Sequence, residues 1–284
     1  MEGIKSIFPT PLVKLSKLSE RLKNDIYAKL ELVNPTGSHK DRETLEVIKN
    51  LKGREVVIAS TGNAAISLSA LALGAGITVH VFISKYINRE RLDLIQTFGP
   101  VLHIVEGSYA DAIKQSEEFA QKNGIEDANP GRNFNKIIGD SHIGEEIGKQ
   151  MNGDIDYIIV PTNNGTLLSG IWHGVKNIAK PHMVAAISPG SKIMESIAGY
   201  HRFDGKELDK AIDESSGKII SINDKEAAHY TLELAKEGIF CEPASGSSLA
   251  AISKLGVKNK KIIVVITGSA LKFIKSYKKI FAYK

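Results

Sequence analysis

The sequence contains a single cysteine, Cys241, in 284 residues. No disulfide can therefore form within the chain, and metal sites built on cysteine pairs are excluded. No uncharged apolar run reaches the ~18 residues that a membrane span needs. The first residues, MEGIKSIFPTPLVKL, lack the basic region and apolar core of a secretory signal. We therefore expect a cytoplasmic protein with no membrane contact and no bound metal.

Several signatures of nucleotide and hydrolytic chemistry are also missing. There is no G-x-x-x-x-G-K-[ST] loop, no G-x-G-x-x-G turn after the first strand of a unit, no H-E-x-x-H and no G-x-S-x-G. The net charge of +5 is modest for this length, and acidic residues are interleaved with the lysines. A nucleic-acid groove would need a concentrated basic stripe. We expect small anionic ligands, and no nucleic-acid partner.

The pattern that is present is an alternation of strands and helices. The length suits about two domains or one large α/β unit. Apolar, β-branched runs predict strands at 56–60, 77–83, 101–107, 156–162, 183–188 and 261–268, with helices between them and a loop at 128–142. Such βαβ units form parallel sheets covered by helices on both faces. Two α/β halves flank a connector near residue 145.

Ligands of open parallel sheets bind outside the carboxyl ends of the strands, so the loops that follow strands are the first places to search. Three such loops are unusual, STGNAA, TNNGTLLSG and TGSALK, and EPASGSS opens a late helix. The TNNGTLLSG loop joins an apolar strand to a helix through small polar residues. Backbone N–H groups and a helix dipole could hold a phosphate there. A tight turn with no ligand explains the same residues.

The stretch NPTGSHKDR places a lysine at the start of a predicted helix. Ser38 and Asp41 have the spacing of a capping box, which puts Lys40 in the first turn. A cation is disfavoured there because the N-terminus of a helix is positive, so Lys40 loses its proton more readily. A deprotonated amine attacks carbonyl groups. Taken alone, the motif is more often that of a solvated surface lysine.

Together these segments resemble the fold type II family of pyridoxal-phosphate (PLP) enzymes, which includes threonine synthase, threonine dehydratase and cysteine synthase. The resemblance runs through YAKLELVNPTGSHKDR, ASTGNAAISLSALALGAGI, NPGR, VPTNNGTLLSGIWHG, CEPASGSSLAAI and VVVITGSALK, in the family's order. It implies two open parallel-sheet α/β domains with the cofactor in the cleft between them. The smaller domain would span 36–145, and the larger would combine 1–35 with 146–284.

The resemblance also implies roles for individual residues. Lys40 would form the Schiff base with PLP and move protons on the substrate. Asn63 would bind the 3′ oxygen of the ring. The substrate carboxylate would bind at the start of a predicted helix, to the residues of the STGN segment: Ser60, Thr61, Gly62 and Asn63.

Further cofactor contacts follow from the later motifs. Thr267 would face the pyridine nitrogen, and a hydroxyl there moderates the electron sink, as suits elimination and replacement better than transamination. The cofactor phosphate would bind to one loop: Asn163, Asn164, Gly165, Thr166 and Leu167. Asn129 and Arg132 would hold a substrate phosphate.

Within the family the chain is most similar to threonine synthases, which convert O-phosphohomoserine and water to threonine and phosphate. It departs from them in the phosphate loop, where they carry Gly-Asn-Ala-Gly-Asn, and around Ser269. A serine/threonine dehydratase, a cysteine-synthase-like replacement enzyme and an inactive PLP-binding relative therefore stay open as alternatives. The resemblance implies an amino-acid substrate and a homodimer.

Overall fold

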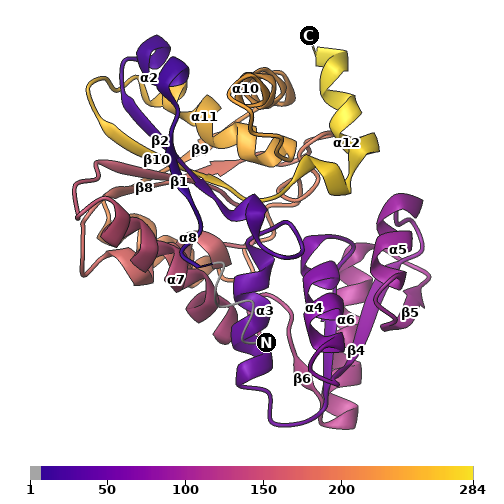
Figure 1. The fold of residues 1–284 in the computed structure, drawn as a ribbon. Coiled ribbons are helices and arrows are strands. Elements are labelled where there is room, and N and C mark those ends of the chain that lie inside the picture. The colour runs from indigo at the N-terminus through magenta and orange to yellow at the C-terminus, as the bar shows by residue number, and fades with distance from the viewer. Residues whose placement is uncertain (1–7, 284) are drawn as a thin grey trace. The chain divides into compact units, whose positions relative to one another are not determined.

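The computed structural model describes residues 8–283, which form two compact units (Figure 1). Unit 1 comprises Phe8 and Lys40–Gly139, and unit 2 comprises Pro9–His39 and 140–283. After Phe8, which precedes Pro9 of unit 2, the chain passes between the units twice more. The first of these passages is the peptide bond between His39 and Lys40, and the second lies inside helix α7 (Asn135–Gln150).

Unit 1 contains a four-stranded parallel sheet in the order β5-β4-β3-β6. Its strands are β3 (Glu55–Ala59), β4 (Thr78–Ser84), β5 (Val101–Val105) and β6 (Glu126–Asp127). Its helices are α3 (Lys40–Lys49), α4 (Asn63–Leu73), α5 (Arg89–Gln96) and α6 (Tyr109–Asn123). This succession of strand and helix is the parallel arrangement expected from the sequence.

The helices of unit 1 are held by the apolar faces of the sheet. The face covered by α6 contributes Val57, Ala59 and Phe82 to a cluster that also contains Ile113 and Ala120 of the helix. Successive strand residues point to opposite faces. Ile58 accordingly lies on the other side, near Leu68 of α4. Helix α3 then packs against α4.

Unit 2 contains a six-stranded sheet in the order β1-β2-β10-β7-β8-β9, parallel except for the edge strand β1. The strands are β1 (Leu12–Lys14), β2 (Asp25–Leu30), β7 (Tyr157–Pro161), β8 (His182–Ile187), β9 (Lys218–Ser221) and β10 (Lys261–Ile266). The helices are α2 (Ser16–Leu22), α8 (Thr166–Val175), α9 (Gly205–Glu214), α10 (Asp224–Lys236), α11 (Pro243–Leu255) and α12 (Ile274–Lys278), with short 3-10 turns η1 (Glu31–Val33), η2 (Ala270–Lys272) and η3 (Lys279–Tyr283).

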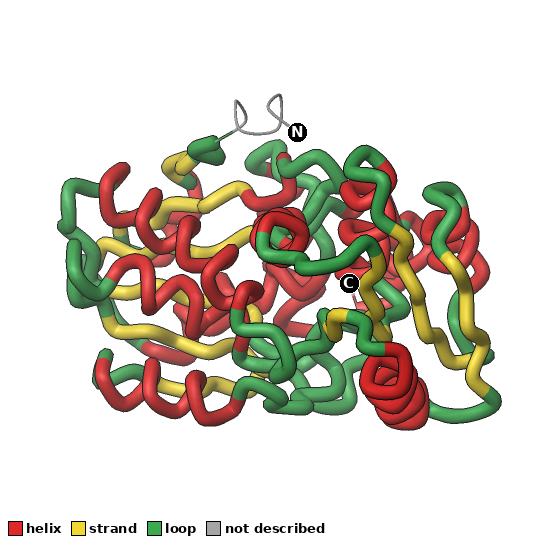
Figure 2. Tube along the Cα trace, turned by 90° about the horizontal axis from the view of Figure 1, so that it is seen from below, coloured by secondary structure: helices red, strands yellow, loops and turns green. Residues whose placement is uncertain are grey.

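Both faces of the unit 2 sheet are buried. In β10, Val264 belongs to the core under α10 and α11, whereas Val265 belongs to the core under α8. Figure 1 shows α2, α10 and α11 on one face and α8 on the other, and Figure 2 shows the strands between rows of helices. A strand covered on both sides has no polar face, which explains the unbroken apolar run IIVVI after Lys261.

The loop predicted at 128–142 is wrong over its second half, because helix α7 already begins at Asn135. Its glycines are what obscured it, since glycine weakens a helix by about 0.5–1 kcal/mol relative to alanine. In the fold, these glycines lie where the backbone of another helix comes close to α7. A Cβ on Gly139 would lie 2.3 Å from the Arg42 carbonyl oxygen in α3, and one on Gly144 would lie 2.1 Å from the Ile171 carbonyl oxygen in α8.

None of the helices within residues 8–283 combines the length and the apolar composition that crossing a membrane requires.

Candidate functional site

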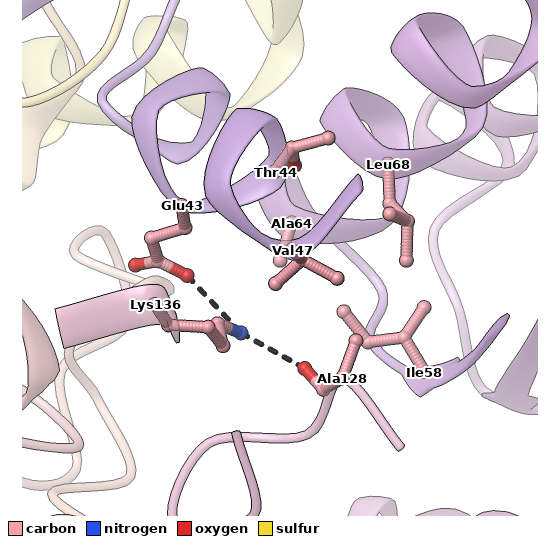
Figure 3. Close-up of a pocket in the computed structure, with 8 residues that line it drawn as sticks. All are labelled: Glu43, Thr44, Val47, Ile58, Ala64, Leu68, Ala128 and Lys136. Atoms are coloured by element: carbon pink, nitrogen blue, oxygen red, sulfur yellow. Dashed lines mark hydrogen bonds and ion pairs between the residues drawn. The ribbon is translucent and has the colours of Figure 1, made fainter. Parts of the chain in front are cut away.

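Lys40 is the first residue of α3, as the sequence predicts for a first-turn lysine. Its side chain is 18% exposed, and its Nζ contacts the carboxylate of Glu43, one turn further along. The same carboxylate lies 3.1 Å from Nζ of Lys136, which also donates to the Ala128 carbonyl oxygen at 3.0 Å (Figure 3). Lys40 is therefore a partly enclosed amine in a network of charges, and not a freely solvated one.

The segment before Lys40 is fixed by backbone contacts inside unit 2. His39 N–H donates to the Thr267 carbonyl oxygen at 3.0 Å, Ser38 bridges to Gly268, and Ser269 N–H donates to the Gly37 carbonyl oxygen at 2.9 Å. Gly37 has φ +78° and would place a Cβ 3.3 Å from a side-chain carbon of Lys272, so a larger residue is strained there. The loop that leads to Lys40 is thus held beside the end of β10.

The predicted capping box does not form. Ser38 lies two residues before α3, and its buried hydroxyl makes no hydrogen bond with any of residues 8–283. The reason is the bridge between Ser38 and Gly268, which holds Ser38 in an extended connection instead of at the helix cap.

The STGN segment links β3 to α4. Gly62 is the N-cap of α4 and no side chain caps the helix. The Gly62 N–H donates to the Ser60 hydroxyl at 3.3 Å, which closes the turn. Arg91 of α5 donates to the Thr61 carbonyl oxygen at 3.3 Å. Asn63 opens the helix. A helix N-terminus without a side-chain cap, with a guanidinium beside it, suits an anion such as a carboxylate.

The loop from Asn163 to Leu167 links β7 to α8. Gly165 is the N-cap, with φ +100°, and again no side chain caps the helix. A Cβ at Gly165 would lie 3.0 Å from the Asp204 carbonyl oxygen. Asn163 holds the neighbouring loop, since its side chain donates to Ser196 and accepts from His201 N–H. Helix α8 has ten residues and begins without a side-chain cap, and backbone N–H groups at such a helix start are of the kind that bind phosphate.

Thr267 directly follows β10 and is 7% exposed. Its N–H donates to the Ser245 hydroxyl at 3.0 Å, and the two hydroxyl oxygens lie 3.2 Å apart. Ser245 is fully buried in the first turn of α11. Gly268 follows, and a Cβ there would meet a carboxylate oxygen of Glu242 at 2.8 Å. The EPAS and TGSA segments therefore form one rigid corner of unit 2 that fixes the Thr267 side chain.

The two residues proposed for a substrate phosphate have partners within unit 1. Asn129 is fully buried; its side chain accepts from Ala59 N–H and donates to the Ser116 hydroxyl, both at 2.8 Å. Arg132 makes a two-point bond to the Glu117 carboxylate at 2.8 and 2.9 Å, which raises its pKa. A role for either residue in substrate binding stays a prediction.

Sequence reasoning missed Glu43, Lys136, Arg91 and Ser245, which surround the predicted residues. Glu43 could have been found from its position three residues after Lys40, where helix geometry brings side chains together. Ser245 lies in a motif that the sequence singled out. Lys136 and Arg91 carry no local signal, because each is brought to its partner by the packing of a separate helix.

The residue types in these segments fit PLP. Its aldehyde requires an amine, which Lys40 of unit 1 would supply. Its phosphate suits the N-terminus of α8, which has no side-chain cap. Its ring nitrogen can form a hydrogen bond with a hydroxyl such as that of Thr267, which Ser245 contacts.

Comparisons with known proteins agree with this fit. The family model for pyridoxal-phosphate dependent enzymes matches residues 4–268. The chain is 31% identical to a threonine synthase of a Bacillus species, over 93% of this chain and 83% of that protein. It is 32% identical to a threonine synthase of Methanocaldococcus jannaschii, over 93% and 75%. Cysteine synthase B of Escherichia coli is 27% identical, over 90% and 88%.

Solved structures share the fold. O-ureido-L-serine synthase superposes with a TM-score of 0.84 at 21% identity, over 98% of this chain and 94% of that chain. Threonine deaminase isoform 2 of Solanum lycopersicum gives 0.81 at 20% identity, over 96% and 82%. The matched family model, the architecture of two parallel-sheet units and the fit of the loops to the cofactor lead to one conclusion: this chain belongs to the pyridoxal-phosphate dependent enzymes of fold type II.

Proposed function

We propose that the protein is a threonine synthase, which converts O-phosphohomoserine and water to threonine and phosphate. The observation that carries the proposal is the similarity to two threonine synthases at 31% and 32% identity over 93% of this chain. The chain also retains the loops that fit the cofactor of those enzymes.

Lys40 is proposed as the residue that holds the cofactor and then moves protons on the substrate carbons. When bound, PLP supplies an electron sink for the carbanion that proton removal leaves. The place of Lys40 supports this role. Its side chain is largely enclosed, and the preceding residue, His39, is anchored to the backbone of Thr267.

The remaining binding roles follow the same loops. The hydroxyl of Thr267 would face the ring nitrogen, and Asn63 would bind the ring oxygen. The segment Ser60–Gly62 would bind the substrate carboxylate, because α4 begins there without a side-chain cap. The cofactor phosphate would bind at the start of α8, in the loop from Asn163 to Leu167.

A second candidate function is replacement or elimination at the β carbon, as in cysteine synthase or serine/threonine dehydratase. The similarity to a cysteine synthase at 27% identity supports it. So does the pairing of Arg132 with Glu117, because a substrate phosphate then needs a different cation. An inactive PLP-binding relative is the third candidate.

The test begins with the colour of the purified protein and with borohydride reduction, which fixes the cofactor to the lysine that holds it. Peptide mass spectrometry should find the modification on Lys40. Lys40→Ala should abolish it, and Lys49→Ala, an exposed position in the same helix, should not. A modified peptide that excludes Lys40 would contradict the assignment of the cofactor lysine.

The substrate is then identified by incubating the enzyme separately with O-phosphohomoserine, serine, threonine and O-acetylserine plus sulfide. Threonine and phosphate released from the first compound alone establish threonine synthase. A 2-oxo acid from serine or threonine, or cysteine from the last mixture, would move the protein to the second candidate. No product from any of them would favour the inactive relative.

The homodimer and the domain division at residues 36 and 145 stay predictions from the resemblance, and the cytoplasmic location stays a prediction from the sequence.

A further inference from the structure

The carboxylate of Glu43 lies between two ammonium groups in unit 1. One oxygen contacts Nζ of Lys40, and the other lies 3.1 Å from Nζ of Lys136. Lys136 comes from the first turn of α7, whereas Lys40 and Glu43 lie in the first turn of α3. Figure 3 shows Glu43 and Lys136 reaching toward each other above the Ala128 carbonyl group.

The Glu43 and Lys136 side chains are buried. Each is 3% exposed. A buried ion pair gains little net stability over apolar residues of the same size, because both charges lose their hydration. Stability alone therefore gives little reason to keep a carboxylate and an ammonium at this place. Their contact with the proposed cofactor lysine gives a functional one.

The geometry of the group is fixed by backbone contacts. Lys136 is held by its bond to Ala128. The close approach of α7 to α3 at Gly139, where a Cβ would lie 2.3 Å from the Arg42 carbonyl oxygen, fixes the two helices at this point. The carboxylate is thereby held against the lysine amine by parts of the fold that cannot easily shift.

We propose that Glu43 and Lys136 are positioning residues that set how strongly Lys40 holds a proton. The carboxylate stabilises the ammonium form of Lys40 and draws its amine to one place. Lys136 weakens that effect, because its positive charge interacts with the same carboxylate and offsets part of the negative charge that acts on Lys40. A lysine that must both attack as an amine and carry a proton from the substrate needs such a balance. The proposal rests on the role proposed for Lys40.

The test compares the reactivity of Lys40 in the full-length protein freed of cofactor. Acetic anhydride acylates unprotonated amines, and peptide mass spectrometry after brief labelling at pH 8 gives the rate at Lys40 relative to exposed Lys49. In Glu43→Gln, labelling of Lys40 should become up to about tenfold faster, since loss of the carboxylate weakens the hold of Lys40 on its proton and one pKa unit corresponds to tenfold. In Lys136→Met it should become slower, because the carboxylate then acts on Lys40 alone.

The opposite signs separate this role from a structural one. A general loosening of α3 would raise labelling in both variants. Glu46→Gln removes a carboxylate one turn further along the same helix, where Glu46 pairs with Lys49, and should leave labelling of Lys40 unchanged. Glu43→Asp, which retains the charge, should stay within about twofold of the wild type. Circular dichroism confirms that each variant is folded, and if Glu43→Gln is not, Lys136→Met and Glu43→Asp carry the test.

Shifts of the same sign in Glu43→Gln and Lys136→Met, an unchanged rate in Lys136→Met, or an equal effect of Glu46→Gln would overturn the proposal. The proposed function is judged separately. Borohydride reduction identifies the lysine that holds the cofactor whatever the labelling rates are, so failure of one proposal leaves a result for the other.

Discussion

Lys29 is a fully buried lysine in β2 of unit 2, and the effect of removing its partner can be worked out from its contacts. Its Nζ donates to three oxygens: Glu146 Oε2 at 2.6 Å, the Thr10 carbonyl oxygen at 2.9 Å and Gln150 Oε1 at 3.0 Å. An ammonium has three N–H donors, so each finds an acceptor. The Lys29 side chain is 0% exposed and that of Glu146 is 14% exposed.

Glu146→Gln keeps the shape of the site and removes the only negative charge among these three acceptors. Breaking a buried pair from one side costs ~3–5 kcal/mol, because the remaining buried charge loses an oppositely charged partner. Glu146 retains some solvent contact, so we expect about 3 kcal/mol, or roughly 6–12 °C in the melting temperature of a domain of this size. Lys29→Met combined with Glu146→Leu removes both charges and should recover most of that loss.

The assay is urea unfolding at pH 7 followed by circular dichroism, with fluorescence of Trp172, which lies in unit 2, as a second probe. Asp25→Asn is the matched control, because its ion pair with Lys14 lies on the surface, 47% exposed on both sides, and its loss should leave the midpoint nearly unchanged. A Glu146→Gln midpoint equal to that of the wild type would refute the reasoning, as would a double variant no more stable than Glu146→Gln.

Three further outcomes follow from the structure. Burial raises the pKa of the Cys241 thiol to about 12, so the native protein should not react with a thiol reagent at pH 8 and should react once unfolded in urea. Burial, and then the neighbouring His80, lower the pKa of His103, so the unfolded state binds the proton better than the folded state. The free energy of unfolding should therefore fall as the pH drops below about 6.5. The urea midpoint of His103→Gln should fall less than that of the wild type over the same pH range. In Gly174→Ala the new Cβ would lie 1.9 Å from the Ser141 carbonyl oxygen, so thermal unfolding should show a loss of at least about 2 kcal/mol, whereas Gly53→Ala, with no contact closer than 4.0 Å, should be neutral; equal melting temperatures would contradict this packing.

Six of the strands could be predicted because each carries its signal in adjacent residues, whereas β1, β2, β6 and β9 were not predicted. The apolar run at β10 and the alternation of strand and helix in both units were sufficient for the α/β class. The loops that follow β3 and β7 were found because small polar residues interrupt apolar runs at the carboxyl ends of strands, where parallel sheets bind ligands. Lys40 was found because a cation is unusual in a first helical turn.

The capping of α3 and the extent of α7 could not be predicted in this way. Ser38 has the right side chain for a cap, but its backbone pairs with Gly268, more than two hundred residues away. Gly139 and Gly144 indicate a loop when each is judged by local preference. In the fold they are helical, because another backbone occupies the space that a side chain would need.

The sequence by itself determined the α/β class, six of the strands, the loops that fit the cofactor and the lysine proposed to hold it, since these depend on side chains that are neighbours in the chain. Only the tertiary structure decided which charges surround that lysine. Glu43 reaches it through one turn of helix, but Lys136 arrives on a helix almost a hundred positions later, and Arg132 is turned to Glu117 by the packing of its own unit. Such partners are selected by the three-dimensional packing of helices, for which local sequence patterns contain no rule.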